Sequence, residues 1–130
     1  MSEQITLRID LDSEVPAYRQ VVNAIRILLV SGQLVPGAEL PSVRRMAIDL
    51  GVHFNTVAEA YRILADEGWV ALRHGKGATV VERKMPEPSA ERLEEFRSRL
   101  ESLAAEMVAQ GASPEKIGSE LLRVWSAFKS

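Results

Sequence analysis

A cluster of polar side chains in residues 53–62 has the chemistry needed to read base edges in DNA. Asn55, Thr56 and Arg62 lie opposite the apolar stripe of an expected helix, and His53 directly precedes that helix. Asn can form two hydrogen bonds with adenine, and Thr can contact a base edge, a thymine methyl group or a phosphate. A helix of this kind fits the DNA major groove. The alternative is that Asn55 caps the helix and Thr56 fills its first turn.

Two further groups of residues could hold the phosphate backbone. Ser42 and Arg44 open the preceding helix, where backbone N–H groups and a guanidinium can clamp a phosphate. Arg45 is adjacent, and we expect only one of the two arginines to act in this way, with Arg44 favoured. The tip of an expected hairpin suits phosphate contacts or insertion into the minor groove, through Arg73, His74, Gly75 and Lys76. An ordinary solvated turn is the alternative for this tip.

The elements that position these residues are predicted to be two short helices joined by a tight turn. Residues 42–50 carry one apolar stripe and end at Gly51, a residue suited to a left-handed cap. Residues 54–67 carry a second stripe and end at Gly68. Two short helices with one apolar face each, joined in this way, are typical of a helix-turn-helix.

Flanking segments complete a winged version of this motif. Residues 16–31 have apolar side chains at helical spacing, and the runs 69–72 and 78–81 are predicted to be strands around the basic tip. Alternation of apolar and polar residues over 5–11 predicts a further strand. The expected fold class is therefore mainly α with a small β-hairpin, a winged helix-turn-helix followed by a helical tail.

The sequence predicts two domains, residues 1–84 and residues 85–130, separated by a short linker that contains two prolines. In the second domain, apolar residues recur at spacings of 3, 4, 3 and 4, and a last helix starts at Ser113. A monomer would expose these apolar faces, so we expect them to fold back or to meet a second copy in a two-fold homodimer. The residues expected in the dimer contact are Leu93, Phe96, Leu100, Leu103, Met107, Leu121 and Trp125.

Composition restricts the class of protein and its compartment. The chain has 130 residues, 46% of them apolar, and no cysteine, which excludes disulfides and thiolate metal sites. No signal peptide or membrane span is recognisable, so we expect a cytoplasmic protein with no membrane partner. The net charge is −2, yet residues 41–84 carry seven basic residues against five acidic ones. This net-basic segment is the one that holds the expected DNA-reading elements.

Many separate positions in residues 5–82 resemble the GntR family of transcription regulators. The matching runs are Pro16-Ala17-Tyr18-Arg19-Gln20, Gly32-Gln33-Leu34-Val35-Pro36-Gly37, Leu40-Pro41-Ser42-Val43-Arg44-Arg45-Met46-Ala47, Asn55-Thr56-Val57 and Gly75-Lys76-Gly77. The early strand and the short tail are similar to the YtrA-type branch, whose members end in two dimerisation helices without a large effector domain. The resemblance implies a winged helix-turn-helix, and it implies DNA contacts by Arg44, His74 and Gly75.

Three positions depart from the family's pattern. His53 stands where Ser or Asn is usual, and Phe54 stands where a polar or basic residue is common. Phe54 could touch a thymine methyl group or pack beneath the helix. Glu59 stands where Lys or Arg is frequent. It could accept a hydrogen bond from cytosine or pair with Arg62, and we favour the ion pair.

The sequence therefore predicts a sequence-specific DNA-binding regulator, with repression as the expected sense, that binds an inverted-repeat operator as a homodimer. A winged-helix module that binds protein is the alternative, because this fold does not determine function. An enzyme is not expected, since the two histidines, His53 and His74, lie at DNA-facing positions and cysteine is absent. No metal and no cofactor are expected. Double-stranded DNA is the expected partner, and a small-molecule effector, a partner protein or the dimer concentration could control binding.

Overall fold

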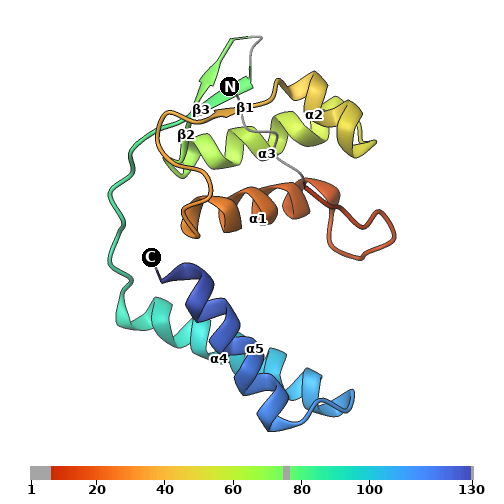
Figure 1. Cartoon of the computed structure of the whole chain (residues 1–130), viewed down its shortest axis with the longest axis vertical. Helices are drawn as coiled ribbons and strands as arrows, with labels where there is room; N and C mark the ends of the chain where they lie inside the picture. Colours follow the sequence, from red (N-terminus) through yellow and green to blue (C-terminus); the bar gives the residue numbers. More distant parts are fainter. Residues whose placement is uncertain (1–6, 75–76, 130) are drawn as a thin grey trace. The chain divides into compact units, whose positions relative to one another are not determined.

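A computed structural model describes residues 7–74 and 77–129, which divide into two compact units between Arg83 and Lys84. The first unit contains helices α1 (Ala17–Val30), α2 (Val43–Leu50) and α3 (Phe54–Asp66) and strands β1 (Glu39–Leu40), β2 (Val70–Arg73) and β3 (Gly77–Val80) (Figure 1). The second unit contains α4 (Ala90–Ala109) and α5 (Pro114–Phe128). The predicted class, mainly helical with a small antiparallel sheet, is confirmed.

Helices begin and end where the sequence supplies capping residues. Ser42 precedes α2, and its hydroxyl accepts a hydrogen bond from the backbone N–H of Arg45 at 3.1 Å. Gly51 ends the same helix in the left-handed conformation, with φ of 71°. Ser89 and Ser113 cap α4 and α5 in the same way as Ser42 caps α2. Gly51 matters most for the site, because it lets the chain turn directly from α2 into α3.

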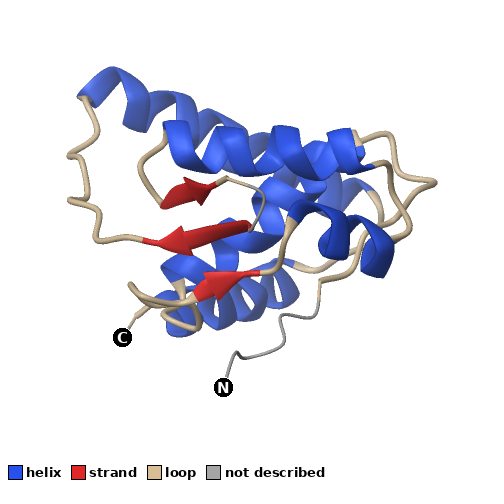
Figure 2. Ribbon diagram, turned by 90° about the horizontal axis from the view of Figure 1, so that it is seen from above, coloured by secondary structure: helices blue, strands red, loops and turns tan. Residues whose placement is uncertain are grey.

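The three strands form one antiparallel sheet in the order β1-β3-β2 (Figure 2). β2 and β3 are the predicted hairpin, in which Arg73 pairs with Gly77. β1 is an addition to the prediction, and its residues pair with Thr79 and Ala78 of β3. A strand of two residues has no readable alternation, so only its pairing with β3 defines it.

The sequence analysis predicted a strand over residues 5–11. This prediction is wrong for residues 7–11, the part of the segment that the structure describes, because they contain no strand. Leu7 and Ile9 are half-buried and pack against the core, so the alternation correctly indicated the inward face. The backbone N–H and C=O of Asp10 bond instead to the side-chain amide of Gln20, at 2.8 Å each. A side chain of α1 therefore occupies the groups that a neighbouring strand would need.

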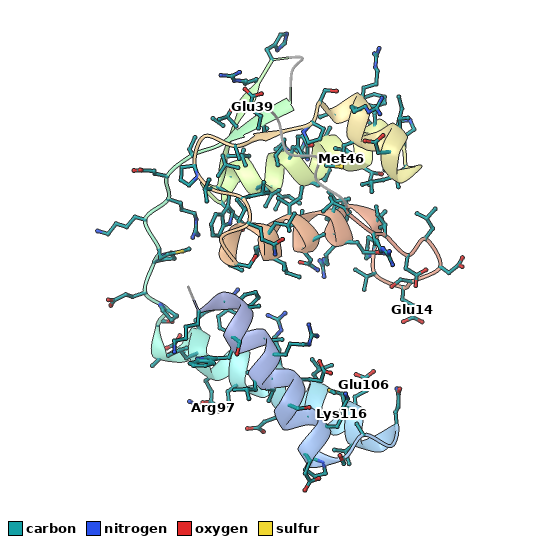
Figure 3. The ribbon with its side chains drawn as sticks, viewed as in Figure 1. Glu14, Glu39, Met46, Arg97, Glu106 and Lys116 are labelled. Carbon is teal, nitrogen blue, oxygen red and sulfur yellow. The ribbon has the colours of Figure 1, made fainter. Side chains whose placement is uncertain are left out.

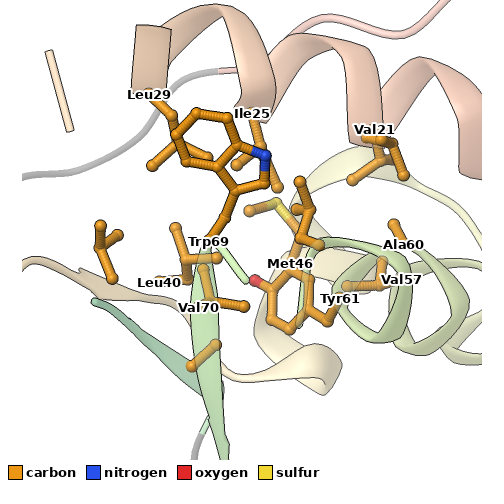
Figure 4. Packing of buried hydrophobic residues seen from close by; sticks show 14 of the residues in the cluster. Val21, Ile25, Leu29, Leu40, Met46, Val57, Ala60, Tyr61, Trp69 and Val70 are labelled. Carbon is orange, nitrogen blue, oxygen red and sulfur yellow. The ribbon is translucent and has the colours of Figure 1, made fainter. Parts of the chain in front are cut away.

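The core of the first unit lies between α1, α2, α3 and the sheet (Figure 4). Tyr61 is 1% exposed in this core, and its hydroxyl donates a hydrogen bond to the carbonyl of Pro41 at 2.7 Å. Burial also raises the pKa of Tyr61. The bond ties α3 to the residues that immediately precede α2. The buried residues that surround it include Val21, Ile25, Leu40, Met46, Val57, Ala60, Leu64, Trp69 and Val70.

The second unit is a pair of helices, α4 and α5, that lie side by side (Figure 1). Neither helix buries a residue within the described chain. Large apolar side chains of the predicted seam are exposed, among them Leu100 and Trp125, each 56% exposed. Charged residues of the same helices, such as Arg97, Glu106 and Lys116, also project outward (Figure 3). Within the described residues, no helix combines the length and apolar character that a membrane span requires.

Candidate nucleic-acid interface

The polar face of α3 is turned away from the core of the first unit. Val57, Ala60, Tyr61 and Leu64 are buried on the inner face of this helix. Asn55 and Arg62 are exposed, and Thr56 and Glu59 are half-buried. Glu59 forms an ion pair with Arg62, which confirms the favoured interpretation of Glu59. The pair makes this part of the face nearly neutral, so it offers a ligand hydrogen-bonding groups more than charge.

His53 and Phe54 form the N-terminal end of α3. His53 Nδ1 accepts a hydrogen bond from the backbone N–H of Asn55 at 3.1 Å, so His53 is the N-cap. The alternative in which Asn55 caps the helix is therefore wrong, and helix capping does not compete with a ligand for the Asn55 side chain. Phe54 is 55% exposed, which also contradicts the alternative that it packs beneath the helix. Its ring stacks on His53, with centroids 4.9 Å apart.

The two adjacent arginines of α2 differ in their partners. Arg45 pairs with Asp49 one turn later on the same helix, with an N–O distance of 3.3 Å. The exposed Arg44 side chain makes no ion pair or hydrogen bond with any residue that the structure describes. Its guanidinium therefore keeps all of its donors for an external anion. Ser42, which was also predicted to contact phosphate, uses its hydroxyl to cap α2.

The wing contributes a second group of basic side chains. Arg73 ends β2, His74 follows it, and both are exposed. Arg73 Nη1 lies 3.2 Å from a carboxylate oxygen of Glu39 on β1, whose side chain is labelled in Figure 3. Both partners of this pair are more than half exposed, so water screens it and a phosphate can compete for the arginine. Gly75 and Lys76, the other predicted residues of the tip, lie outside the described residues.

A groove of about 800 Å³ lies where α2, α3 and the hairpin meet. It brings together four of the predicted site residues, Ser42, Arg44, Arg73 and His74, with residues from all three elements. The full lining is Ser42, Val43, Arg44, Phe54, Ala58, Tyr61, Leu72, Arg73, His74 and Gly77. The lining contains no Asp or Glu, although Glu39 pairs with Arg73 from outside it. Arg44 has no such partner among the described residues, so its charge favours an anionic ligand.

The remaining predicted residues lie beside the groove instead of in it. These are Arg45, His53, Asn55, Thr56 and Arg62, of which only Thr56 is half-buried and the others are exposed. Leu72 is a groove residue that the sequence analysis did not single out, because its type and position are those of an ordinary strand residue. Among the residues that the structure describes, no group of three or more His, Asp or Glu side chains could hold a metal ion.

Comparisons with known proteins place these elements in a family. Residues 17–80 match the family model described as bacterial regulatory proteins, gntR family. The HTH-type transcriptional repressor YtrA of Bacillus subtilis is 29% identical over 111 residues, which cover 85% of this chain and 85% of that protein. The probable rhizopine catabolism regulatory protein MocR of Rhizobium meliloti is 35% identical over 108 residues, which cover 83% of this chain. The chain spans only 22% of the length of MocR.

Solved structures give the same result for the fold. YtrA from Sulfolobus acidocaldarius, a GntR-family transcription factor, is 34% identical with a TM-score of 0.55, and the match covers 95% of this chain and 100% of that one. The DNA-binding domain of AraR in complex with operator ORX1 is 26% identical with a TM-score of 0.50, over 58% of this chain and 93% of that one. The predicted winged helix-turn-helix is therefore confirmed.

Proposed function

Because the chain belongs to the GntR family of bacterial regulatory proteins, we propose that it is a transcription repressor that binds an inverted-repeat operator as a homodimer. Its relatives are DNA-binding regulators and not enzymes. Similarity to YtrA of Bacillus subtilis extends over most of both chains, and that protein is named as a repressor, which supports repression as the sense of regulation.

One observation carries the DNA-binding part of the proposal. The polar face of α3 is exposed directly beside a groove lined by Arg44, Arg73 and His74. A helix that enters the major groove needs such a face for the base edges, with basic groups on either side for the two phosphate strands. In this proposal Arg44 and the wing hold the backbone, and Asn55 and Thr56 read bases. Ser42, Arg45, His53 and Arg62 flank these contacts, and the predicted DNA contacts of Gly75 and Lys76 concern residues outside the described ones.

The dimer part of the proposal rests on the apolar faces of the second unit. Large apolar side chains of both helices are exposed to water. The exposed fraction is more than half for Leu100, Leu103, Leu121 and Trp125, 49% for Leu93 and 39% for Phe96. Apolar area of this extent on two packed helices is unfavourable in water unless a second surface covers it. We assign that role to the same helices of a second copy. Residues 1–84 would then bind DNA and residues 85–130 would dimerise, with Met107 completing the contact.

The symmetry of the dimer determines the form of the operator. Two identical DNA-binding units related by a two-fold axis require two half-sites in inverted orientation, about 34 Å apart when the recognition helices enter successive major grooves. A small molecule or a partner protein could control binding by changing that spacing. A change in dimer concentration would control it differently, by changing the fraction of the protein that is dimeric.

The first test selects bound sequences from random duplex DNA and then titrates the selected operator at fixed salt. Arg44→Ala should weaken binding to every sequence by a similar factor, because it removes a phosphate contact. Asn55→Ala should weaken binding and also relax the sequence preference at one base pair per half-site. Arg45→Ala is the matched control, since this arginine lies on the same helix and is already paired with Asp49. Equal affinities for wild type, Arg44→Ala and Asn55→Ala would refute these roles.

The rival function, a winged-helix module that binds protein, is separated from this one by salt. Only neutralisation of phosphates releases condensed counterions, so DNA binding must weaken steeply as salt rises. A full-length protein that selects no duplex sequence and binds DNA without salt dependence would favour the rival.

The second test concerns the dimer and uses sedimentation of the full-length protein at micromolar concentration. Leu100→Glu places a charge in the proposed contact and should yield monomers. Ser98→Glu is its control, because Ser98 lies two residues away and thus on nearly the opposite side of α4. A wild-type monomer, or a dimer that both variants leave unchanged, would contradict the assignment.

A further inference from the structure

Phe54 and Leu72 are two large apolar side chains exposed in the groove that also holds Arg44, Arg73 and His74. They are 55% and 52% exposed, and they line the same groove although they come from α3 and β2. Single exposed apolar residues are ordinary on protein surfaces, but two that converge on one groove indicate an apolar ligand group. The roles assigned above use neither residue.

Leu72 faces the groove because of its place in the strand. Val70, two residues earlier on β2, is 4% exposed and belongs to the core. Alternate residues of a strand point to the same face, so Leu72 lies on the inward face of the hairpin. The core ends at Val70 on this face, and the groove begins at Leu72. Leu72 is thus an inward-facing residue that is left half-exposed.

Phe54 is directed toward the groove by the geometry of α3. Ala58 and Tyr61 follow it at spacings of four and seven residues, and all three line the groove. The ring of His53 stacks on Phe54, and His53 is itself held by its hydrogen bond from the Asn55 N–H. These contacts restrain the Phe54 ring before any ligand is bound, which lowers the entropy that binding must overcome.

The charge of the groove indicates the class of ligand. Arg44 lines it without an acidic partner, and Arg73 lines it with a solvent-screened pair to Glu39 that a phosphate can replace, so the ligand combines negative charge with an apolar group. Duplex DNA has this combination, because the thymine C5-methyl group is the apolar feature of the major groove and phosphates flank it on both strands. An apolar protein helix would cover Phe54 and Leu72 but would leave the basic groups without partners.

We propose that Phe54 and Leu72 together read the methyl group of one thymine in each operator half-site. The inference rests on the proposed function and deepens it, because it assigns a base identity close to the one read by Asn55. Phe54 is then a specificity-determining residue whose side chain distinguishes thymine from the other bases by apolar contact.

The test replaces thymine by deoxyuridine, which lacks only the 5-methyl group, at each thymine of the selected operator in turn. Binding of the full-length protein is titrated at one fixed salt concentration. We expect one position per half-site where the replacement weakens binding about fourfold, the equivalent of one buried methyl group. Replacement in both half-sites should weaken binding about sixteenfold.

Two variants show whether Phe54 is the reader. Phe54→Ala should bind the thymine and deoxyuridine forms of the site equally. Ile48→Ala is the matched control, because Ile48 is an apolar residue of α2 that is 67% exposed and lies outside the groove. This control should keep the fourfold difference. Leu72→Ala gives an independent measurement from the opposite wall and should reduce the difference.

Several results would overturn the inference. These are a selected half-site without thymine, a thymine-containing site at which no deoxyuridine weakens binding, and a Phe54→Ala protein that keeps the methyl effect. A Phe54→Ala protein that is folded by circular dichroism and loses the same affinity for every sequence would also contradict it. Failure of the wild-type protein to select any duplex would instead refute the proposed function, so the two failures are distinguishable.

Discussion

The close packing of Gly77 against the chain before α2 gives a sharp prediction about stability. Gly77 has φ of +88°, and a Cβ atom placed on it would lie 2.7 Å from the carbonyl oxygens of both Leu40 and Pro41. Gly68 has nearly the same backbone conformation, with φ of +87°, but its added Cβ would meet only side-chain atoms of Arg83 at 3.9 Å. The two glycines therefore have nearly the same φ, and they differ in how closely neighbouring backbone atoms approach them.

The expected cost of each alanine substitution follows from this difference. Gly68→Ala introduces a side chain at positive φ, which costs about 1–2 kcal/mol. Gly77→Ala carries the same cost and must also move two backbone carbonyl groups apart from β3, an overpacking that costs about 1–3 kcal/mol more. The gain from a less flexible unfolded chain is common to both variants and cancels in the comparison. Gly77→Ala should thus be less stable than Gly68→Ala by about 2 kcal/mol.

The assay is urea unfolding followed by the fluorescence of Trp69, which is 8% exposed in the core of the first unit. A Trp125→Phe background removes the other tryptophan of the chain. With an ordinary dependence of stability on urea, the difference corresponds to a midpoint about 1 M lower for Gly77→Ala, at one fixed protein concentration. Equal midpoints for the two variants would refute the argument, because they would mean that the contact with Leu40 and Pro41 relaxes at no cost.

Three other outcomes are expected. Tyr61→Phe should destabilise the first unit by about 1–2 kcal/mol in the same unfolding assay, because the Pro41 carbonyl loses its partner, whereas the half-buried Tyr18→Phe should change little. Glu67→Gln should cost about 0.5–1 kcal/mol at low salt and less in high salt, because it removes the charge that pairs with Arg26 at 2.5 Å, and a salt-independent loss would contradict this. For operator binding, a dimer with about three phosphate contacts per protomer should give a slope of about −5 for log K against log salt, and a slope near zero would exclude the phosphate contacts.

The helices could be predicted from the sequence because their signals are local. Ser42 and Ser113 are followed by apolar residues at helical spacing, and Gly51 supplies the left-handed cap where the pattern stops. The strands were less readable because pairing is non-local. β1 exists only through its bonds to β3, while the segment 5–11 has the alternation of a strand and yet gives its Asp10 groups to Gln20.

The site shows the same division between local and non-local information. Helical spacing was enough to place Asn55 and Arg62 on the exposed face of α3, since Val57 and Leu64 mark the buried face. Spacing could not show that His53 caps this helix, because imidazole is not among the usual capping groups. Nor could it show that Phe54 and Leu72 line one groove, since that depends on how the hairpin packs beside α3.

The pattern of ion pairs explains how an acidic chain can present a DNA-binding surface. The net charge of the whole chain is −2, and Arg26, Arg45, Arg62 and Arg73 are paired with carboxylates of the first unit. A paired arginine attracts phosphate less than an unpaired one, and Arg44 has no such partner among the described residues. Arg44 therefore supplies an uncompensated positive charge in the groove.

Pairing of basic groups with carboxylates favours specificity over general affinity. Non-specific binding grows with the number of phosphates that a protein neutralises, and a paired arginine contributes less to it than an unpaired one. Contacts to base edges and to a thymine methyl group add only at the correct sequence, and they raise the specific affinity without raising the background. A regulator must find its operator among a large excess of other sites, so the ratio of the two affinities matters more than either one. The net charge of −2 is thus compatible with the proposed function, in which Arg44 lies on the helix that precedes Asn55 and Thr56.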